Sequence, residues 1–298
     1  MKLRLTGAGG LLGSAVMAAA AQRGDRCDAL ARPVLGQFAG SGAGQPAITA
    51  AQLAPALAGY DVLVHAAANT NVEACETAPD DCYRDNFLLT ELLAEAAALA
   101  GVRMVFVSST GVYGTGSDAP YREYQEAVPT THHHRSKLLG EQRVLALDAR
   151  NLVVRTGWLF GGSAANPKNF VARRIDEARA ALAAGGHLAS NAQQRGVPCW
   201  NHDVAARLLD LAQAGVSGVV NCVNSGNASR CEYVAAVVQL AGIAVDVQPS
   251  TAASFARKAR VSHNEMADNW KMATLGWPDM PDWRASLAAY LHGDLAGY

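Results

Sequence analysis

Charged residues are scarce in this chain, and neither sign is in excess. Only 17% of the 298 residues are charged, and 25 Lys and Arg residues stand against 26 Asp and Glu, a formal net charge of −1. Proteins that bind nucleic acid or anionic membranes through charge normally carry a basic excess, so we expect neither partner. Half of the residues are hydrophobic, which excludes a disordered chain and is enough for a sizeable core.

Closely spaced cysteines and long hydrophobic runs are also missing. No CxxC pair occurs, and the His, Asp and Glu residues show no metal-ligand spacing, so we expect reduced thiols in a cytoplasmic protein and no metal. The longest apolar run, Leu11–Ala21, contains Gly13 and Ser14 and is too short to cross a bilayer. The scattered cysteines are Cys27, Cys75, Cys82, Cys199, Cys222 and Cys231.

Short apolar segments alternate with helical segments in the first part of the chain. Apolar strands without polar alternation indicate a parallel sheet covered on both faces, so we predict an α/β fold with a doubly wound (Rossmann) sheet. The predicted strands are Lys2–Thr6, Arg26–Ala31, Asp61–Ala66, Val102–Ser108 and a later one beginning at Leu152–Arg155, and the clearest helices are Leu11–Gln22 and Ala78–Leu99.

The second half of the chain predicts a smaller carboxyl-terminal α/β lobe for the substrate. We expect residues 1–160, with segments from about 197–225, to form the dinucleotide-binding domain. Residues 161–196 and 226–298 then form the discontinuous substrate lobe. Within this half, Gly185–Val197 carries loop signals and Ala244–Gln248 predicts a short strand.

A glycine cluster directly follows the first strand and opens the first helix. In Thr6–Gly13, Gly7 permits a tight turn, Gly10 lets a pyrophosphate approach the backbone, and Gly13 allows close packing of helix on strand. The N–H groups at the start of the helix, at Leu11 and Leu12, would face the phosphates. No Lys-Ser or Lys-Thr follows the glycines, so this is not a P-loop.

Arg32 follows the second strand, where sites that prefer NAD usually have an acidic residue to bind the ribose 2′-hydroxyl. A cation at this place suits the 2′-phosphate of NADP. We therefore predict NADP as the cofactor rather than NAD. A solvent-exposed arginine at the start of a loop is the alternative.

Hydroxyl and basic residues follow in the order that one enzyme superfamily uses. Ser108–Gly114 comes after the fourth strand, and His132–Lys137 opens a helix. Three further segments belong to the same pattern: the Thr6–Gly13 turn, His65–Glu73 and Val154–Gly161. Together these motifs resemble those of the extended short-chain dehydrogenases/reductases, and most closely those of the dTDP-4-dehydrorhamnose reductase branch of sugar-nucleotide reductases. The resemblance covers nearly the whole chain.

The family's catalytic set is a Ser or Thr, a Tyr, and a Lys four residues after that Tyr. The resemblance places Ser109 at the first position and Lys137 at the last, but His133 stands where the Tyr belongs. Neither Tyr121 nor Tyr124, nor any other Tyr of the region, has a Lys at this spacing. We expect Ser109 to orient the carbonyl, Lys137 to hold the ribose and His133 to supply the proton, directly or through water. The charge of Lys137 nearby disfavours the imidazolium form of His133. A polar helix start without catalytic use is the alternative for His133.

The resemblance implies further contacts of both ligands. The substrate contacts follow less directly from the resemblance than the cofactor contacts do. For the basic run that ends at Arg260, a solvent-exposed surface without a ligand is the alternative interpretation. We expect His65 to end a buried strand beside the cofactor, without an acid or base role. The expected cofactor residues are Gly7, Gly10, Leu11, Leu12, Gly13, Arg32, Ala66, Ala67, Ala68, Asn86 and Lys137, and the substrate candidates are Thr70, Tyr113, Trp158, Trp200 and Arg260.

These expectations favour NADPH-dependent reduction of a carbonyl, on a sugar nucleotide or a related polar metabolite. A nucleotide-binding regulatory or sensing protein without turnover is the alternative. An epimerase or dehydratase of the same fold fits less well, because dehydratases add an acidic residue where this chain has Thr110 and Gly111. The Ala-rich faces of two predicted helices permit a homodimer without demonstrating it.

Overall fold

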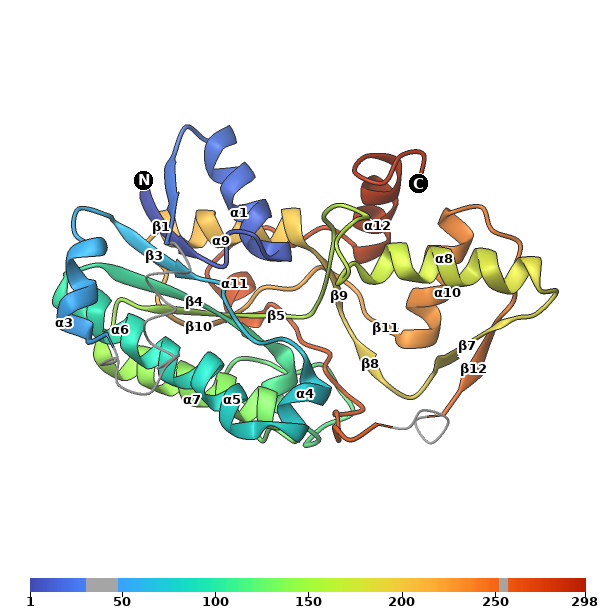
Figure 1. Ribbon diagram of the computed structural model, residues 1–298, viewed down its shortest axis with the longest axis horizontal. Helices are drawn as coiled ribbons and strands as arrows, with labels where there is room; N and C mark the ends of the chain where they lie inside the picture. The colour runs from blue at the N-terminus through green and yellow to red at the C-terminus, as the bar shows by residue number, and fades with distance from the viewer. Residues whose placement is uncertain (31–47, 252–256) are drawn as a thin grey trace.

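A six-stranded parallel sheet forms the centre of the molecule (Figure 1). A computed structural model describes residues 1–30, 48–251 and 257–298 of the chain. The strand order is β10-β5-β4-β3-β1-β2, and every neighbouring pair runs parallel. This is the doubly wound sheet that the sequence predicts. Its strands are β1 (Lys2–Thr6), β2 (Arg26–Ala29), β3 (Val62–His65), β4 (Arg103–Ser109), β5 (Leu152–Thr156) and β10 (Gly218–Asn221).

Apolar side chains point to both faces of the sheet because helices cover both faces. Leu3 and Val64 belong to a core cluster shared with α1 and α9, whereas Leu63 and Phe106 belong to a cluster shared with α3, α6 and α7. Successive strand residues alternate between these two clusters, as the period of two requires. The bounds of these helices are α1 (Leu11–Gln22), α9 (Asn201–Gln213), α3 (Ala50–Leu53), α6 (Leu89–Leu99) and α7 (His132–Leu147).

The strand order reverses between β1 and β3, so the connections leave the sheet in opposite directions there. In open α/β sheets, ligands bind outside the carboxyl ends of the strands at such a point. The residues that follow β1, β3 and β4 therefore share one edge of the sheet. These residues include the glycine turn, Ala66–Ala68 and the segment after Ser109.

The rest of the chain forms a second lobe beyond the carboxyl edge of the sheet (Figure 1). An aromatic cluster that includes Phe160, Tyr233, Trp283 and Tyr290 fills its core. The residue bounds of the two lobes stay a prediction, but the chain does return to the large sheet for α9 and β10. The elements of the second lobe are β6 (Trp158–Phe160), α8 (Phe170–Ala183), β7 (Leu188–Asn191), β8 (Arg195–Gly196), β9 (Pro198–Trp200), β11 (Ala228–Ser229), α10 (Arg230–Leu240), β12 (Val247–Ser250) and α12 (Trp283–His292).

The predicted helix Ala78–Leu99 is confirmed to within one residue, as α5, a π-helical turn and α6 in unbroken succession. Two other predictions are wrong. The predicted loop Gly185–Val197 contains β7 and β8. The predicted strand Ala244–Gln248 instead forms Val247–Ser250, which includes Pro249, and this is tolerated because β12 pairs only with β7. The remaining elements are η2 (Ala54–Ala56), α4 (Val72–Thr77), α5 (Pro79–Tyr83), the π-turn η3 (Arg84–Leu88), η4 (Thr110–Tyr113) and α11 (Trp270–Thr274).

A buried ion pair joins α7 to the sheet. The Arg155 side chain on β5 donates to both carboxylate oxygens of Glu141, with the shortest distance, from Nη2 to Oε2, at 2.6 Å. Ser108 Oγ donates to the same carboxylate at 2.5 Å. Burial alone would lower the pKa of Arg155, but the hydrogen bonds and charge of Glu141 raise it above its usual value. The pair therefore stays charged and fixes α7 against β4 and β5.

Replacing Glu141 by Gln should destabilise the fold strongly. The variant leaves the Arg155 charge buried without a counter-ion, and breaking such a pair costs about 3 kcal/mol or more in the free energy of unfolding. Urea unfolding measures this loss. Glu91→Gln is the matched control, because Glu91 forms a partly exposed pair with Arg143 at 3.0 Å and should cost less than about 1 kcal/mol. Equal losses in both variants would contradict the role of the Glu141 pair.

Candidate functional site

The glycine turn has the geometry of an anion-binding helix start. Gly7 has φ +77°, and the Gly10 N–H donates to the Gly7 carbonyl at 2.8 Å. A Cβ atom at Gly13 would overlap that same carbonyl, so only glycine allows α1 to lie this close to β1. Gly10 has no side chain to cap α1, which leaves the first-turn N–H groups at Leu11 and Leu12 available to a ligand.

The backbone after β3 lies directly against this turn. A Cβ atom at Gly7 would come within 2.7 Å of the Ala67 nitrogen, so the two segments touch. The Ala67 N–H donates to Thr6 Oγ1 at 3.4 Å, and the Ala66 N–H donates to the Thr6 carbonyl at 3.3 Å. Ala66–Ala68 are partly buried. The expected cofactor residues from β1 and β3 are therefore brought together.

Asn86 holds the loop after β3 in place from the π-helical turn η3. The Asn69 N–H donates to Asn86 Oδ1 at 2.7 Å, and Asn86 Nδ2 donates to the Asn69 carbonyl at 3.1 Å. Asn86 is fully buried and also donates to Ser136 Oγ and Cys82 Sγ. Its amide is thus committed to the protein. The structure makes Asn86 a residue that positions the cofactor loop rather than one that presents its own amide to the cofactor.

His65 is fixed as a neutral side chain beneath the site. Its Nδ1 lies 2.6 Å from Thr6 Oγ1, its Nε2 lies 3.0 Å from Thr90 Oγ1, and its ring stacks on Phe106. Burial, with a smaller contribution from the charge of Lys137, lowers the pKa of His65 to about 3. Both nitrogens are occupied, so His65 has the structural role that the sequence indicated.

Ser109 ends β4 at the carboxyl edge of the sheet. Its Oγ accepts a hydrogen bond from the Gly111 N–H at 3.1 Å, and its side chain is only partly buried. The hydroxyl hydrogen remains available to a second acceptor. A Cβ atom at Gly111 would overlap the His134 ring, so no side chain fits at that position. An acidic side chain at Gly111 would therefore require the His134 ring to move, and the residue next to Ser109 is Thr110.

His133 and Lys137 lie one turn apart on α7, and both side chains are buried. The N-cap Thr131 accepts from the His134 N–H at 3.2 Å and sets where α7 begins. His133 is only 7% exposed, yet neither ring nitrogen has a hydrogen-bond partner among the residues that the structure describes. Buried polar atoms are rarely left unpaired, so the two nitrogens fit a site that awaits a ligand.

The pKa values of these two side chains are shifted by burial. Burial, with the nearby His134 and Lys137, lowers the pKa of His133 to about 3. Burial likewise lowers the pKa of Lys137 to about 7, although the charge of Glu141 opposes this. Lys137 Nζ lies 4.0 Å from the centroid of the Phe106 ring. Burial therefore favours the neutral form of the His133 imidazole, and the role of His133 as the proton donor stays a prediction.

The side chains of two expected substrate residues are buried and hydrogen-bonded within the protein. Tyr113 is fully buried, stacks on Tyr121 with ring centroids 4.7 Å apart, and donates its hydroxyl to Asn221 at 2.8 Å. Trp158 is 8% exposed, and its Nε1 donates to Glu265 at 2.6 Å. Neither ring presents a free polar atom to a ligand. The sequence placed both residues near the site but could not show which way their side chains point.

The other substrate candidates lie nearer the surface. Trp200 is partly buried, its Nε1 has no partner in the described parts of the chain, and its ring stacks on His202. Thr70 Oγ1 accepts from Lys168 Nζ at 3.2 Å, which bridges the two lobes. Arg260 is exposed. Arg32 falls between residues 30 and 48 and so lies outside the described residues.

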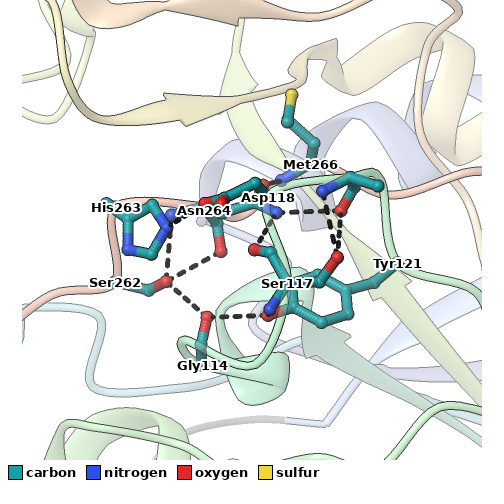
Figure 2. Close-up of polar contacts among 9 residues, drawn as sticks. Gly114, Ser117, Asp118, Tyr121, Ser262, His263, Asn264 and Met266 are labelled. Carbon is teal, nitrogen blue, oxygen red and sulfur yellow. Dashed lines mark hydrogen bonds and ion pairs between the residues drawn. The ribbon is translucent and has the colours of Figure 1, made fainter.

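The segment that carries Glu265 is tied to the loop that follows η4. Figure 2 shows residues 262–266 hydrogen-bonded to residues 114–121. Asn264 Nδ2 donates to the carbonyls of Ser117 and Ala119 at 2.8 and 2.9 Å. The second lobe is thereby fixed to the segment that begins just after Ser109. The other labelled residues of this contact are Gly114, Asp118, Tyr121, Ser262, His263 and Met266.

Two charged side chains that the sequence analysis did not single out lie at Trp158. Besides Glu265, Arg230 stacks over the indole, with its Cζ 3.4 Å from the ring centroid. Arg230 is the first residue of α10, directly after the capping Ser229. A cation at a helix N-terminus opposes the helix dipole, and this is the one signal in the sequence that could have drawn attention to it.

Comparison with known proteins agrees with this geometry. The family model described as "RmlD substrate binding domain" matches residues 1–295. A dTDP-4-dehydrorhamnose reductase from Mycobacterium tuberculosis is 35% identical over 97% of this chain and 92% of its own length. A probable dTDP-4,6-dihydroxy-2-methyloxan-3-one 4-ketoreductase from Streptomyces antibioticus is 30% identical over 96% of this chain and 93% of its own.

A solved structure shows the same fold. The dTDP-4-dehydrorhamnose reductase of Bacillus anthracis, in complex with NADP, superposes with a TM-score of 0.87 at 23% identity and covers 98% of this chain and 99% of its own. In the described parts of this chain, no group of three or more His, Cys, Asp or Glu residues could hold a metal ion. None of the described helices is long and apolar enough to span a bilayer.

Asn86→Ala should weaken NADPH binding without removing a direct contact. The variant loses both hydrogen bonds to Asn69, so the loop after β3 must be ordered when NADPH binds. That ordering uses part of the binding free energy, and we expect the Kd for NADPH to rise about tenfold. Calorimetric titration with NADPH measures this. Asn151→Ala is the matched control, because buried Asn151 also joins two backbone segments, with bonds of 2.7 and 2.8 Å, but lies at the opposite edge of the sheet. An equal loss of affinity in both variants would contradict the positioning role.

Proposed function

The chain belongs to the family described as RmlD substrate binding domain, in the extended branch of the short-chain dehydrogenases/reductases, and on that premise we propose that it is an NADPH-dependent reductase of a 4-keto sugar nucleotide. The observation that carries the proposal is the unpaired, buried His133 one turn from Lys137 on α7, the helix that packs against β4 and η4, where Ser109 lies. The reductase and the 4-ketoreductase among the similar proteins share this class of substrate.

The residues at the carboxyl edge fit a dinucleotide. The uncapped start of α1 and the glycine turn suit a pyrophosphate, and Ala66–Ala68 supply a wall of small side chains beside it. We propose that Lys137 holds the nicotinamide ribose and that Arg32 binds the 2′-phosphate. When bound, NADPH supplies the hydride.

Three side chains then handle the carbonyl oxygen. Ser109 Oγ donates a hydrogen bond to it and stabilises the negative charge that develops there. The neutral His133 transfers its ring N–H proton to that oxygen, and its other nitrogen takes a proton from the Lys137 ammonium, directly or through water. Lys137 is reprotonated from solvent. A group with a pKa near 7 is well matched to this task, whereas an imidazolium with a pKa near 3 is almost absent at neutral pH.

The pH profile should follow Lys137 rather than His133. The ammonium is present below its pKa and is lost above it, so kcat/KM for reduction should be level below about pH 6 and fall tenfold per unit above about pH 7. Initial rates of NADPH oxidation with a panel of 4-keto sugar nucleotides measure this. A profile that rises steadily down to about pH 4 would instead require the His133 imidazolium as the donor.

His133→Gln should lower kcat by about 100-fold or more and leave NADPH affinity unchanged, since an amide cannot relay a proton. His133→Tyr restores the family's Tyr–Lys spacing and should retain activity. His132→Gln is the control, because His132 contacts Tyr83 and takes no part in the relay. Wild-type kcat in His133→Gln would refute the relay. No turnover in wild type, with activity only in His133→Tyr, would favour a nucleotide-binding regulatory protein.

Arg32→Ala should separate the two dinucleotides. Only NADPH carries the 2′-phosphate, so the variant should lose about 10- to 100-fold in affinity for NADPH, as expected for one charge-assisted hydrogen bond, and none for NADH. Titrations of wild type and variant with both nucleotides measure this. A wild type that binds NADH as tightly as NADPH would contradict the assignment.

A further inference from the structure

Residues 257–267 connect two segments at the carboxyl edge of the sheet, and we call this stretch the strap. Near its start, the N–H groups of Lys258 and Ala259 both donate to Glu73 Oε2, at 2.9 and 3.2 Å. Near its end, the strap is hydrogen-bonded to the loop that follows η4 (Figure 2). Glu73 comes after β3 and that loop comes after β4, so the strap joins segments that leave two neighbouring strands.

The two ends of the strap are held in different ways. At the loop end, Ser262 and Asn264 are only 1% exposed, and both side chains bond to the loop after η4. At the other end, no hydrogen bond besides those to Glu73 joins residues 257–261 to the described parts of the chain. Arg257 Nε lies 4.0 Å from Glu73 Oε1, but both side chains are about half exposed, so this ion pair is weak. One carboxylate therefore holds the start of the strap.

The position of Glu73 depends on the loop that is expected to contact the cofactor. Glu73 lies in the first turn of α4, and Asn71 caps that helix by accepting a backbone N–H at 3.0 Å through its Oδ1. Two residues earlier, Asn69 is held by Asn86, and Ala67 touches the glycine turn. A ligand that fixes this loop therefore also fixes the start of α4 and the carboxylate of Glu73.

The strap also holds a side chain of the second lobe. It carries Glu265, whose Oε2 accepts from the Trp158 indole at 2.6 Å, and Trp158 is one of the expected substrate residues. A continuous set of contacts thus leads from the glycine turn, through Glu73 and the strap, to the part of the second lobe where substrate contacts are expected.

We propose that Glu73 is a positioning residue through which bound NADPH holds the strap in place, so that NADPH and the nucleotide-sugar substrate each raise the affinity for the other. The proposal rests on the function given above. Without NADPH, the two bonds at the partly exposed Glu73 open together with the cofactor loop. With NADPH bound, the strap is ordered before the substrate arrives, which lowers the cost of ordering it during substrate binding.

Hydrogen exchange tests the contact itself. NADPH should slow the exchange of the Lys258 and Ala259 amides by about tenfold in wild type, because their hydrogen bonds then open less often. In Glu73→Ala these amides should exchange fast with or without NADPH. Asp61→Ala is the matched control. Asp61 Oδ2 also accepts a backbone N–H from a distant residue, Lys2, at 2.7 Å, but both residues belong to the lobe of the large sheet, so the strap should respond to NADPH as in wild type.

Calorimetry tests the coupling between the ligands, with dTDP as a probe that cannot be reduced. Saturating NADPH should lower the Kd of wild type for dTDP by about tenfold, and saturating dTDP should lower the Kd for NADPH by the same factor. Glu73→Ala should reduce this factor to about twofold or less and leave the Kd for NADPH alone within about twofold of wild type. Glu73→Gln keeps an acceptor oxygen without the charge and should give an intermediate factor. A residue that only stabilises the fold would leave the factor unchanged.

Two results would overturn the proposal: strap amides that NADPH leaves unprotected while it protects those of Leu11 and Leu12, or an unchanged coupling factor in Glu73→Ala. Should Glu73→Ala fail to fold, Glu73→Gln decides, because the factor must still fall. Failure of the proposed function gives a different pattern. A wild type that reduces no sugar nucleotide, but whose strap is protected by NADPH through Glu73, would refute the reductase and keep the role of Glu73. Normal reduction with no response of the strap would do the opposite.

Discussion

The pairing of Glu141 with Arg155 governs the electrostatics of the whole site. Glu141 lies one turn beyond Lys137 on α7, but its carboxylate is taken by Arg155 and Ser108. Lys137 is thus buried against the Phe106 ring without a counter-ion within ion-pair distance in the described parts of the chain, and its pKa falls to about 7. A charge that would otherwise be permanent becomes titratable, and its proximity helps to keep His133 neutral.

Arg155 and Arg230 differ in the contacts that their guanidinium groups make within the protein. Arg155 is paired with Glu141 through its Nε and Nη2 groups, so its charge stabilises the contact of α7 with the sheet. Arg230 is partly exposed and stacks over the Trp158 ring. Stacking on an aromatic ring orients a guanidinium without using its N–H groups, whereas a carboxylate uses them.

The sequence predicted the parts of the site that depend on neighbours along the chain. The turn from Gly7 to Gly13, the strand before it and the helix after it follow from local conformation, and Ser109 and Lys137 from a spacing shared with a family. Arg230 and Glu265 were not predicted because both contact Trp158, which lies 107 residues before Glu265 in the chain. Tyr113 and Trp158 are buried and hydrogen-bonded within the protein, because proximity to the site along the chain does not determine the direction of a side chain, and their substrate contacts stay a prediction.

His133 changes what the rest of the site must do. A phenol loses its own proton and can stand alone as a donor, but a neutral imidazole can give up its N–H proton only if its second nitrogen is protonated at the same time. Both nitrogens must therefore be free of protein partners, as they are among the described residues. A proton source of matched pKa must also lie within reach, and Lys137, one helical turn away, meets that condition because Arg155 holds Glu141. On the proposed mechanism, a histidine can take the place of the family's tyrosine where a nearby lysine has a pKa close to neutral, as Lys137 has.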